Sequence, residues 1–195
     1  MRRARLEALV DRHAHAPRVE DLASGERRAI DLDIPGVALK DPVIATGADG
    51  QWHMWVCCHP LDVPGAEDRM WTSYASSPDG LTWTDHGPVL TGRAGRWDER
   101  GARITAVLDA DRVLYDGRPD AASNWHETTG VARRDGQSVH AGGRLVATDD
   151  EPVRSPYSDG ALRYASAVTD ADGRARLYVE RARPDGAHDL VTLAA

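Results

Sequence analysis

The sequence is poor in several residue types, and each shortage narrows the classes of protein to which it can belong. It contains no Phe and only two Cys, which are adjacent at Cys57 and Cys58. Neighbouring residues of an extended strand point to opposite faces, so these two are not expected to form a disulfide with each other. Free thiols favour a reducing, cytoplasmic setting. No run of ~18 or more apolar residues occurs, so no membrane-spanning helix is expected.

Positive charge is also in deficit, with 24 Lys and Arg against 31 Asp and Glu and a net charge of −7. This balance argues against a general affinity for nucleic acid or for an anionic membrane, and neither is expected as a partner. A Gly-rich phosphate loop, a Cys-x-x-Cys pair and a Gly-x-Ser-x-Gly elbow are missing as well. The basic start at residues 1–6 is not followed by an apolar stretch, so it is not expected to be a signal peptide.

What the sequence does contain is typical of a globular protein, with 41% hydrophobic and 28% charged residues. Six Trp and five Tyr suit both a β-rich core and a platform for stacking on sugars. Leu6, Leu9 and Val10 have roughly helical spacing, which predicts a short surface helix. We therefore divide the chain into a helix and lead-in segment at 1–36 and a β domain at 37–195.

From residue 37 onward, short β-type runs alternate with Asp-Gly turns. Asp-Gly is a strong hairpin signal because both residues tolerate positive φ. The expected strands form two groups of four and begin a third: 42–46, 51–58, 70–76 and 81–85; 102–108, 112–115, 127–133 and 137–145; 162–168 and 175–182. A four-strand repeat of ~40–50 residues is the spacing of a propeller blade. The fold class is thus all-β with propeller-like blades, and a β-sandwich is the alternative.

Two stretches carry a resemblance to a known family. Residues 40–44 and 49–55, read as Lys-Asp-Pro-Val-Ile and Asp-Gly-Gln-Trp-His-Met-Trp, resemble the opening of a blade in five-bladed glycoside hydrolases of families 43, 32, 68 and 130. Residues 74–83 resemble the hairpin between the third and fourth strands of such blades, Ala-x-Ser-x-Asp-Gly-x-x-Trp, and 129–136 contain a degraded copy. The resemblance implies a β-propeller that acts on carbohydrate.

The length departs from this pattern, because the chain has room for about three blades of ~40–50 residues. Three blades leave sheet edges open, and open edges pair readily with another chain. The chain is therefore a shortened relative, a fragment, or one part of a homo-oligomer that completes the propeller. These alternatives stay open at the level of the sequence.

The resemblance also implies that catalytic acids lie on the innermost strands, near the propeller axis. Asp41 matches the family's Asp-Pro carboxylate best; its other interpretation is a turn residue made extended by Pro42. Asp98 and Glu99 follow Trp97 in a segment that loosely resembles the Trp-Glu segment bearing the general acid in family 32. Burial beside Trp97 would raise a carboxyl pKa, as an acid catalyst requires. A solvated, ion-paired loop is the alternative.

The other candidates would bind sugar hydroxyls or stack on sugar rings, and no cofactor or metal is expected. They are Trp55, Trp97, Arg103, Asp116, Arg118, Glu127 and Arg163. Asp116 and Arg118 also fit an ordinary turn. A strand over 53–59 would place His53, Cys57 and His59 on one face, but ~20 Å separates the ends of such a strand. Packing is therefore favoured over metal binding.

Two functional hypotheses follow. The first is hydrolysis of a glycosidic bond by paired carboxylates, and the second is a non-catalytic carbohydrate-binding or self-associating propeller remnant. They differ in geometry, since a retaining enzyme needs carboxyl groups about 5–5.5 Å apart and an inverting one about 6.5–9.5 Å apart.

Overall fold

The computed structural model describes residues 18–20, 27–30, 32–146, 155–158 and 160–194, and this part of the chain is almost entirely β. The expected N-terminal helix lies outside the described residues. None of the helices in the described ranges is long and apolar enough to cross a bilayer. The strands are β1 (Arg18–Glu20), β2 (Arg27–Ala29), β3 (Val37–Thr46), β4 (Trp52–Pro60), β5 (Trp71–Ser77), β6 (Thr84–Leu90), β7 (Gly101–Val107), β8 (Arg112–Arg118), β9 (Thr128–Asp135), β10 (Ser138–His140), β11 (Leu162–Thr169), β12 (Ala175–Ala182) and β13 (His188–Ala194), with 3₁₀ turns η1 (Ala122–Trp125) and η2 (Pro156–Ser158).

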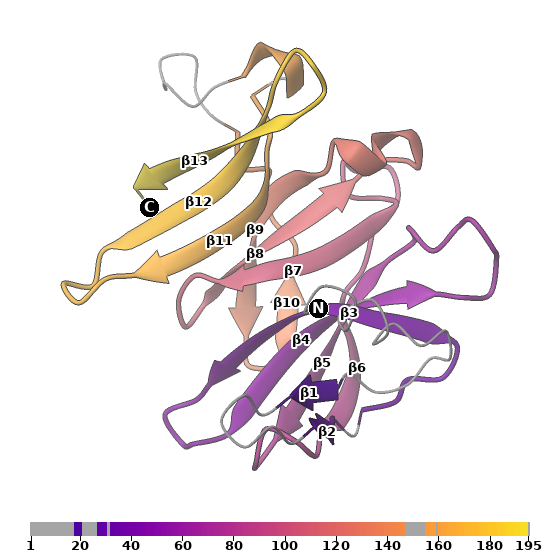
Figure 1. Ribbon diagram of the computed structural model, residues 1–195, viewed down its shortest axis with the longest axis vertical. Coiled ribbons are helices and arrows are strands. Elements are labelled where there is room, and N and C mark those ends of the chain that lie inside the picture. The colour runs from indigo at the N-terminus through magenta and orange to yellow at the C-terminus, as the bar shows by residue number, and fades with distance from the viewer. Residues whose placement is uncertain (1–17, 21–26, 31, 147–154, 159, 195) are drawn as a thin grey trace, which may run out of the picture.

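Three antiparallel sheets follow one another along the chain, apart from the small β1–β2 pair. Their strand orders are β3-β4-β5-β6, β7-β8-β9-β10 and β11-β12-β13, so each is a simple meander. Figure 1 shows the three sheets fanned out from the middle of the molecule, and β7 contacts both β3 and β11. We call these sheets blades 1, 2 and 3 and their first strands the innermost strands. The architecture is a partial propeller, as the sequence predicts.

Side-chain alternation on the strands creates the packing between blades. On β4, Met54, Val56 and Cys58 face one core cluster together with Ile30 and Leu32 of the lead-in segment. Trp55 faces the opposite way, into a second cluster shared by blades 1 and 2. A third cluster lies between blades 2 and 3 and includes Leu114, Leu162 and Val179. Period-two alternation thus places an apolar layer on both faces of the middle blade.

Several expected strand bounds were wrong, since β3 for example begins at Val37 and not at residue 42, and two of the errors have a local cause. The fourth strand of blade 1 begins at Thr84, not at residue 81, because the Asp79 carboxylate accepts hydrogen bonds from the backbone amides of Leu81 and Thr82. Those amides are therefore held in the loop and do not join the ladder. The strand expected at 137–145 is only Ser138–His140.

The cause of the shorter strand is Arg93. Its Nη1 and Nη2 atoms donate to the carbonyl oxygens of Ala141 and Gly142, at 3.0 and 3.1 Å. These carbonyls therefore face a side chain and are lost to the ladder. The chain returns to β9 only at Arg144, as an isolated bridge to Gly130.

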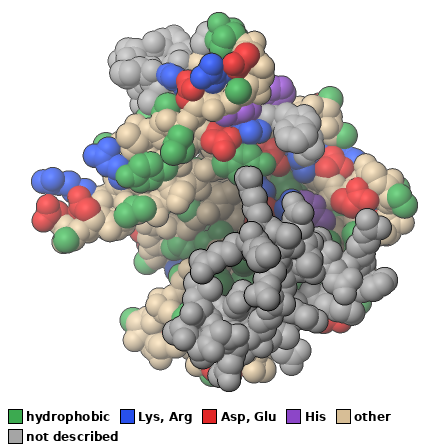
Figure 2. Space-filling model, viewed as in Figure 1, with side chains coloured by type: hydrophobic (Ala, Val, Ile, Leu, Met, Phe, Trp, Pro, Cys, Tyr) green, Lys and Arg blue, Asp and Glu red, His purple; other side chains and the backbone are tan. Residues whose placement is uncertain are grey.

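The hairpins that carry the family resemblance occupy the predicted places. Residues 74–83 join β5 to β6, and 129–136 lead from β9 towards β10. Gly80 has a φ of 75°, which glycine adopts without steric cost. The third sheet has three strands among the described residues, and the ring does not close within them; its completion by a second chain stays a prediction. Figure 2 shows hydrophobic side chains on this sheet's outer surface, where Val168, Tyr178 and Leu190 are exposed.

Candidate functional site

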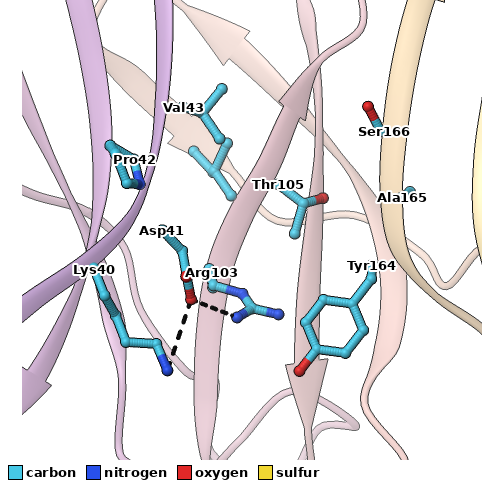
Figure 3. A pocket seen from close by; sticks show the side chains of 10 residues that line it. Lys40, Asp41, Pro42, Val43, Arg103, Thr105, Tyr164, Ala165 and Ser166 are labelled. Atoms are coloured by element: carbon cyan, nitrogen blue, oxygen red, sulfur yellow. Dashed lines mark hydrogen bonds and ion pairs between the residues drawn. The ribbon is translucent and has the colours of Figure 1, made fainter. Parts of the chain in front are cut away.

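A pocket of about 420 Å³ opens where the three innermost strands meet. Residues 40–43 of β3, 103–105 of β7 and 164–166 of β11 form its wall. Figure 3 shows Asp41, Arg103 and Tyr164 directed towards one another across this pocket. The site thus draws one short segment from each blade, and we call it the central pocket.

Irregular backbone turns these segments towards the pocket. The register of β3 shifts between Lys40 and Val43, and that of β11 shifts between Arg163 and Ser166. Asp41 and Tyr164 lie inside these bulges with φ of 51° and 50°, and no other non-glycine residue in the described part of the chain has a positive φ. Such residues cost of order 1–3 kcal/mol each and cluster at functional sites. The two strained residues lie on opposite walls of the same pocket.

Asp41 is the carboxylate that the pocket exposes. Its Oδ2 accepts a hydrogen bond from Nη1 of Arg103 at 2.8 Å and lies 3.8 Å from Nζ of Lys40. The Asp41 side chain is 45% exposed, whereas that of Arg103 is 7% exposed. A ligand in the pocket can therefore reach the carboxylate, while the guanidinium is held from behind.

Two buried carboxyl groups hold that guanidinium. Nη2 of Arg103 donates to Asp116 Oδ2 and to Glu127 Oε2, both at 3.1 Å. Burial raises the pKa of Asp116 and of Glu127, although Arg103 opposes the shift in both. Burial alone would lower the pKa of Arg103, but Glu127 and Asp116 together raise it above its ordinary value. The three groups form one network of charges enclosed by protein.

Asp116 also fixes the backbone of the third blade. Its Oδ2 accepts a hydrogen bond from the backbone amide of Tyr164 at 3.0 Å, and its Oδ1 accepts one from the Thr129 hydroxyl at 2.6 Å. The bulge at Tyr164 is thereby tied to blade 2. Asp116 thus positions two walls of the pocket without being exposed in it.

The ring of Tyr164 lies between two guanidinium groups. The Cζ atoms of Arg103 and Arg163 are 4.6 and 4.8 Å from the ring centroid. Arg163 is itself paired with Glu180 at 2.9 Å, and Arg118 is paired with Glu127 at 3.0 Å. Cation–π contacts of this kind hold an aromatic ring in one orientation. Tyr164 is nonetheless 41% exposed, so part of it is available to a ligand.

Of the predicted residues, Asp41 and Arg103 line the central pocket, and Asp116, Glu127, Arg118 and Arg163 stand around it. Asp98 and Glu99 lie elsewhere. Asp98 is fully buried and bound by Arg93 Nε at 2.9 Å and the Tyr115 hydroxyl at 3.0 Å. Glu99 lines a separate pocket of about 540 Å³ and accepts a hydrogen bond from Gly95 N. The structure therefore does not bring these two carboxylates to the pocket that contains Asp41.

The two tryptophans are packing residues in this arrangement. Trp55 is 1% exposed in the core between blades 1 and 2. Trp97 packs against Tyr115, with ring centroids 5.3 Å apart, at the edge of the same cluster. Sequence reasoning gave Thr105 and Thr129 no role. Thr105 lies on the pocket wall, and its Oγ1 is buried with no hydrogen-bond partner among the described residues.

The sequence predicted Arg163 of the third blade, and a pattern shared with the first blade marks the bulge that follows it. Lys40-Asp41-Pro42 and Arg163-Tyr164-Ala165 each place a cation before the bulged residue, at the same point of two innermost strands. The signal is only three residues long, and it becomes clear once the bulges are known.

No protein-family model and no curated protein match the chain. Solved structures do. Zg3597, a family 117 glycoside hydrolase of Zobellia galactanivorans, superposes with a TM-score of 0.66 at 17% identity, over 86% of this chain and 56% of that one. β-1,2-Mannobiose phosphorylase from Listeria innocua superposes with a TM-score of 0.56 at 18% identity, over 85% of this chain and 46% of that one. Fructan 1-exohydrolase IIa from Cichorium intybus superposes with a TM-score of 0.55 at 17% identity, over 84% of this chain and 31% of that one.

The fold is therefore the propeller of glycoside hydrolases. The resemblance implied by residues 40–55 and 74–83 is confirmed at the level of fold. The chain spans little more than half the length of Zg3597 and less of the other two. It corresponds to a part of such a propeller.

Proposed function

We propose that the chain binds a carbohydrate in the central pocket, with Asp41 and Arg103 as its main polar contacts. The observation that carries this proposal is the Asp41–Arg103 pair at the meeting point of three blades, with the carboxylate exposed and the guanidinium braced. A sugar hydroxyl both donates and accepts hydrogen bonds, so a carboxylate beside a guanidinium matches both functions.

The shape of the pocket supports the proposal. Its volume of about 420 Å³ lies in the range of ~300–1,000 Å³ typical of small-molecule sites. The part of Tyr164 that stays exposed beside the two guanidinium groups adds apolar contact area next to the polar pair, a combination that suits the two-sided surface of a sugar ring. The names of the fold neighbours add support, because a glycoside hydrolase, a mannobiose phosphorylase and a fructan exohydrolase all act on carbohydrates.

A second candidate is hydrolysis, with Asp41 and Glu127 as the carboxyl pair. Burial raises the pKa of Glu127, which is the property that a general acid needs. The two carboxylates are bound to different nitrogens of the same Arg103 guanidinium. Glu127 is only 4% exposed, so Arg103 would have to move before a glycosidic oxygen could reach it. For this reason binding is the better supported function, and pairs built on Asp98 or Glu99 have less support.

The test is a calorimetric binding titration of the full chain with a panel of mono- and disaccharides. We expect at least one saccharide to bind, and Asp41→Ala to weaken it about tenfold or more. The matched control is Asp109→Ala, which removes an exposed, ion-paired carboxylate on the β7–β8 turn and should bind as wild type does. Equal binding by Asp41→Ala and wild type, or no binding by wild type, would overturn the proposal.

The same preparation tests hydrolysis with aryl-glycosides of the saccharides that bind. The second candidate would be established if wild type releases the aryl group and both Asp41→Asn and Glu127→Gln fail to do so. Saccharide binding without release of the aryl group would leave binding as the function.

A further inference from the structure

A cluster of soft donor atoms lies on β4 of blade 1, where Cys57 is the cross-strand partner of Lys40. Cys57 and His59 are two residues apart on β4, so their side chains share a face of the strand. Cys57 Sγ lies 3.2 Å from Nε2 of His59 and 3.7 Å from Sδ of Met70, which directly precedes β5. The Cys57 sulfur is thus in contact with both an imidazole nitrogen and a thioether sulfur.

The orientation of His59 leaves its inner nitrogen free to bind. Nδ1 lies 2.8 Å from the carbonyl oxygen of Glu67. A carbonyl oxygen can only accept, so Nδ1 carries the proton and Nε2 presents its lone pair towards Cys57. A metal-binding histidine is usually fixed in this way, by a hydrogen bond from its other nitrogen to a carbonyl or a carboxylate.

We propose that Cys57, His59 and Met70 form a binding site for a soft monovalent metal ion, Cu(I). Thiolate and thioether sulfur select soft ions such as Cu(I), and imidazole is a common third ligand. Donors about 2.0–2.3 Å from a shared ion lie roughly 3.3–4 Å from one another. The two separations at Cys57, 3.2 and 3.7 Å, are close to this range.

Charge favours a monovalent ion over a divalent one. Arg118 Nη2 lies 3.7 Å from Sδ of Met70. One thiolate and one Cu(I) make a neutral pair, whereas Zn²⁺ on the same three ligands would leave an uncompensated positive charge in a buried site.

Binding exchanges a proton for the metal and involves no redox step. The Cys57 S–H bond is lost, a Cys57 sulfur–Cu(I) bond forms, and the proton passes to solvent. Of the three ligands, His59 is partly exposed. His59 lines a cavity of about 350 Å³ with Glu67 and Asp68, and Met70 lines the pocket that contains Glu99.

The other use of a Cys–His pair, as a nucleophile and its base, fits poorly. Cys57 is 1% exposed, so the carbon of a substrate cannot reach its sulfur, whereas a single ion can pass between side chains. In the described part of the chain, no group of three His, Cys, Asp or Glu side chains could hold a metal. The site therefore depends on the Met70 thioether, and this dependence can be tested.

The experiment is an anaerobic titration of the full chain with Cu(I) against a chromogenic Cu(I) chelator. We expect one equivalent to bind, Cys57→Ser to lose binding, and Met70→Leu to weaken it roughly tenfold or more. Cys58→Ser is the matched control: Cys58 is the adjacent, equally buried thiol, faces the other core cluster, and contacts the Val56 carbonyl. It should bind as wild type does.

Equal losses in Cys57→Ser and Cys58→Ser, or unchanged binding by Met70→Leu, would overturn the proposal. X-ray absorption of the wild-type Cu(I) complex keeps the test decisive even if a cysteine variant fails to fold. A shell of two sulfurs and one nitrogen is expected, and a shell of oxygen and nitrogen alone would refute the site. Stoichiometric Zn²⁺ binding without Cu(I) binding would refute it as well.

Discussion

Nη1 of Arg103 lies 2.8 Å from Oδ2 of Asp41, although the two residues belong to different blades and are 62 positions apart in the chain. The contact joins the one partly exposed carboxylate of the central pocket to a guanidinium whose other amino group is bound by Asp116 and Glu127. The orientation of Asp41 therefore depends on groups that a ligand does not touch. Changes at Arg103 are therefore expected to affect both the stability of the fold and the binding of a ligand by Asp41.

Removal of the Arg103 charge should destabilise the fold strongly. Arg103→Met leaves Asp116 and Glu127 buried without their common partner, and such a loss typically costs about 3–5 kcal/mol. Urea unfolding of wild type and variant gives the difference. Arg112→Met is the control, because it breaks an exposed ion pair with Asp109 and should change stability little. A similar small effect in both variants would show that the buried network contributes nothing particular.

The same variant should have a different pH dependence. Burial raises the pKa of Asp116 and Glu127 in the folded state, and loss of the opposing Arg103 charge should raise both further. A raised carboxyl pKa costs stability above the unfolded pKa values of about 3.9 and 4.3, and the cost grows as pH rises through the folded values. The gap between Arg103→Met and wild type should therefore narrow as pH falls towards 4. A gap independent of pH would contradict the assignment.

Thr72 is predicted to hold blade 2 against blade 1. Its Oγ1 donates to the Ala102 carbonyl at 3.2 Å and accepts from the Ile104 amide at 2.9 Å, all three groups being buried. Thr72→Val keeps the shape but leaves a buried amide unpaired, which costs about 1–3 kcal/mol. Thr72→Ser retains the hydroxyl and should lose only the smaller contribution of a methyl group. Thermal unfolding distinguishes the two variants. A lower melting temperature for Thr72→Ser than for Thr72→Val would refute this role.

The regular part of this fold could be predicted from the sequence because it depends on local patterns. Alternation along 177–180 and the Asp-Gly turns at 79–80 and 135–136 indicated strands and hairpins, and the structure has them there. The boundaries at 81–84 and 141–145 could not be predicted, since they depend on side chains that take backbone groups out of the ladder.

In the site, too, some residues could be predicted from local patterns and others depend on contacts between distant parts of the chain. Asp41 stood out through its Asp-Pro context, and Arg103 through its place near the second blade. The contacts among Arg103, Asp116, Glu127 and the Tyr164 amide join residues 13 to 48 positions apart, and no local pattern fixes them. The bulges decide which side chains face the pocket.

Close packing around Gly130 gives a third stability prediction. A Cβ at this position would lie 2.7 Å from the Trp97 ring and 2.8 Å from Cε1 of Tyr115, so Gly130→Ala should destabilise by about 1–3 kcal/mol. Gly143→Ala is the control, because nothing lies within 4 Å of its added methyl group. Equal melting temperatures for the two variants would show that Trp97 is free to move aside.

The Asp79 loop should make stability sensitive to acid. The backbone amides of Thr82 and Leu81 and the Ser77 hydroxyl donate to its carboxylate and lower its pKa to about 2. A depressed folded pKa gives stability that is fully present above the unfolded value near 3.9 and is lost as pH falls towards 2. Asp79→Asn should be less stable than wild type at neutral pH, and the difference should shrink between pH 4 and 2.

Urea unfolding at a series of pH values measures this difference. Asp172→Asn serves as the control, because Asp172 lies in another Asp-Gly turn, where its carboxylate is 4.0 Å from the exposed Arg174. A difference between Asp79→Asn and wild type that stays constant down to pH 2 would mean that the loop does not depend on the ionised carboxylate. The hydrogen bonds to Leu81 and Thr82 would then be insufficient to explain why β6 begins only at Thr84.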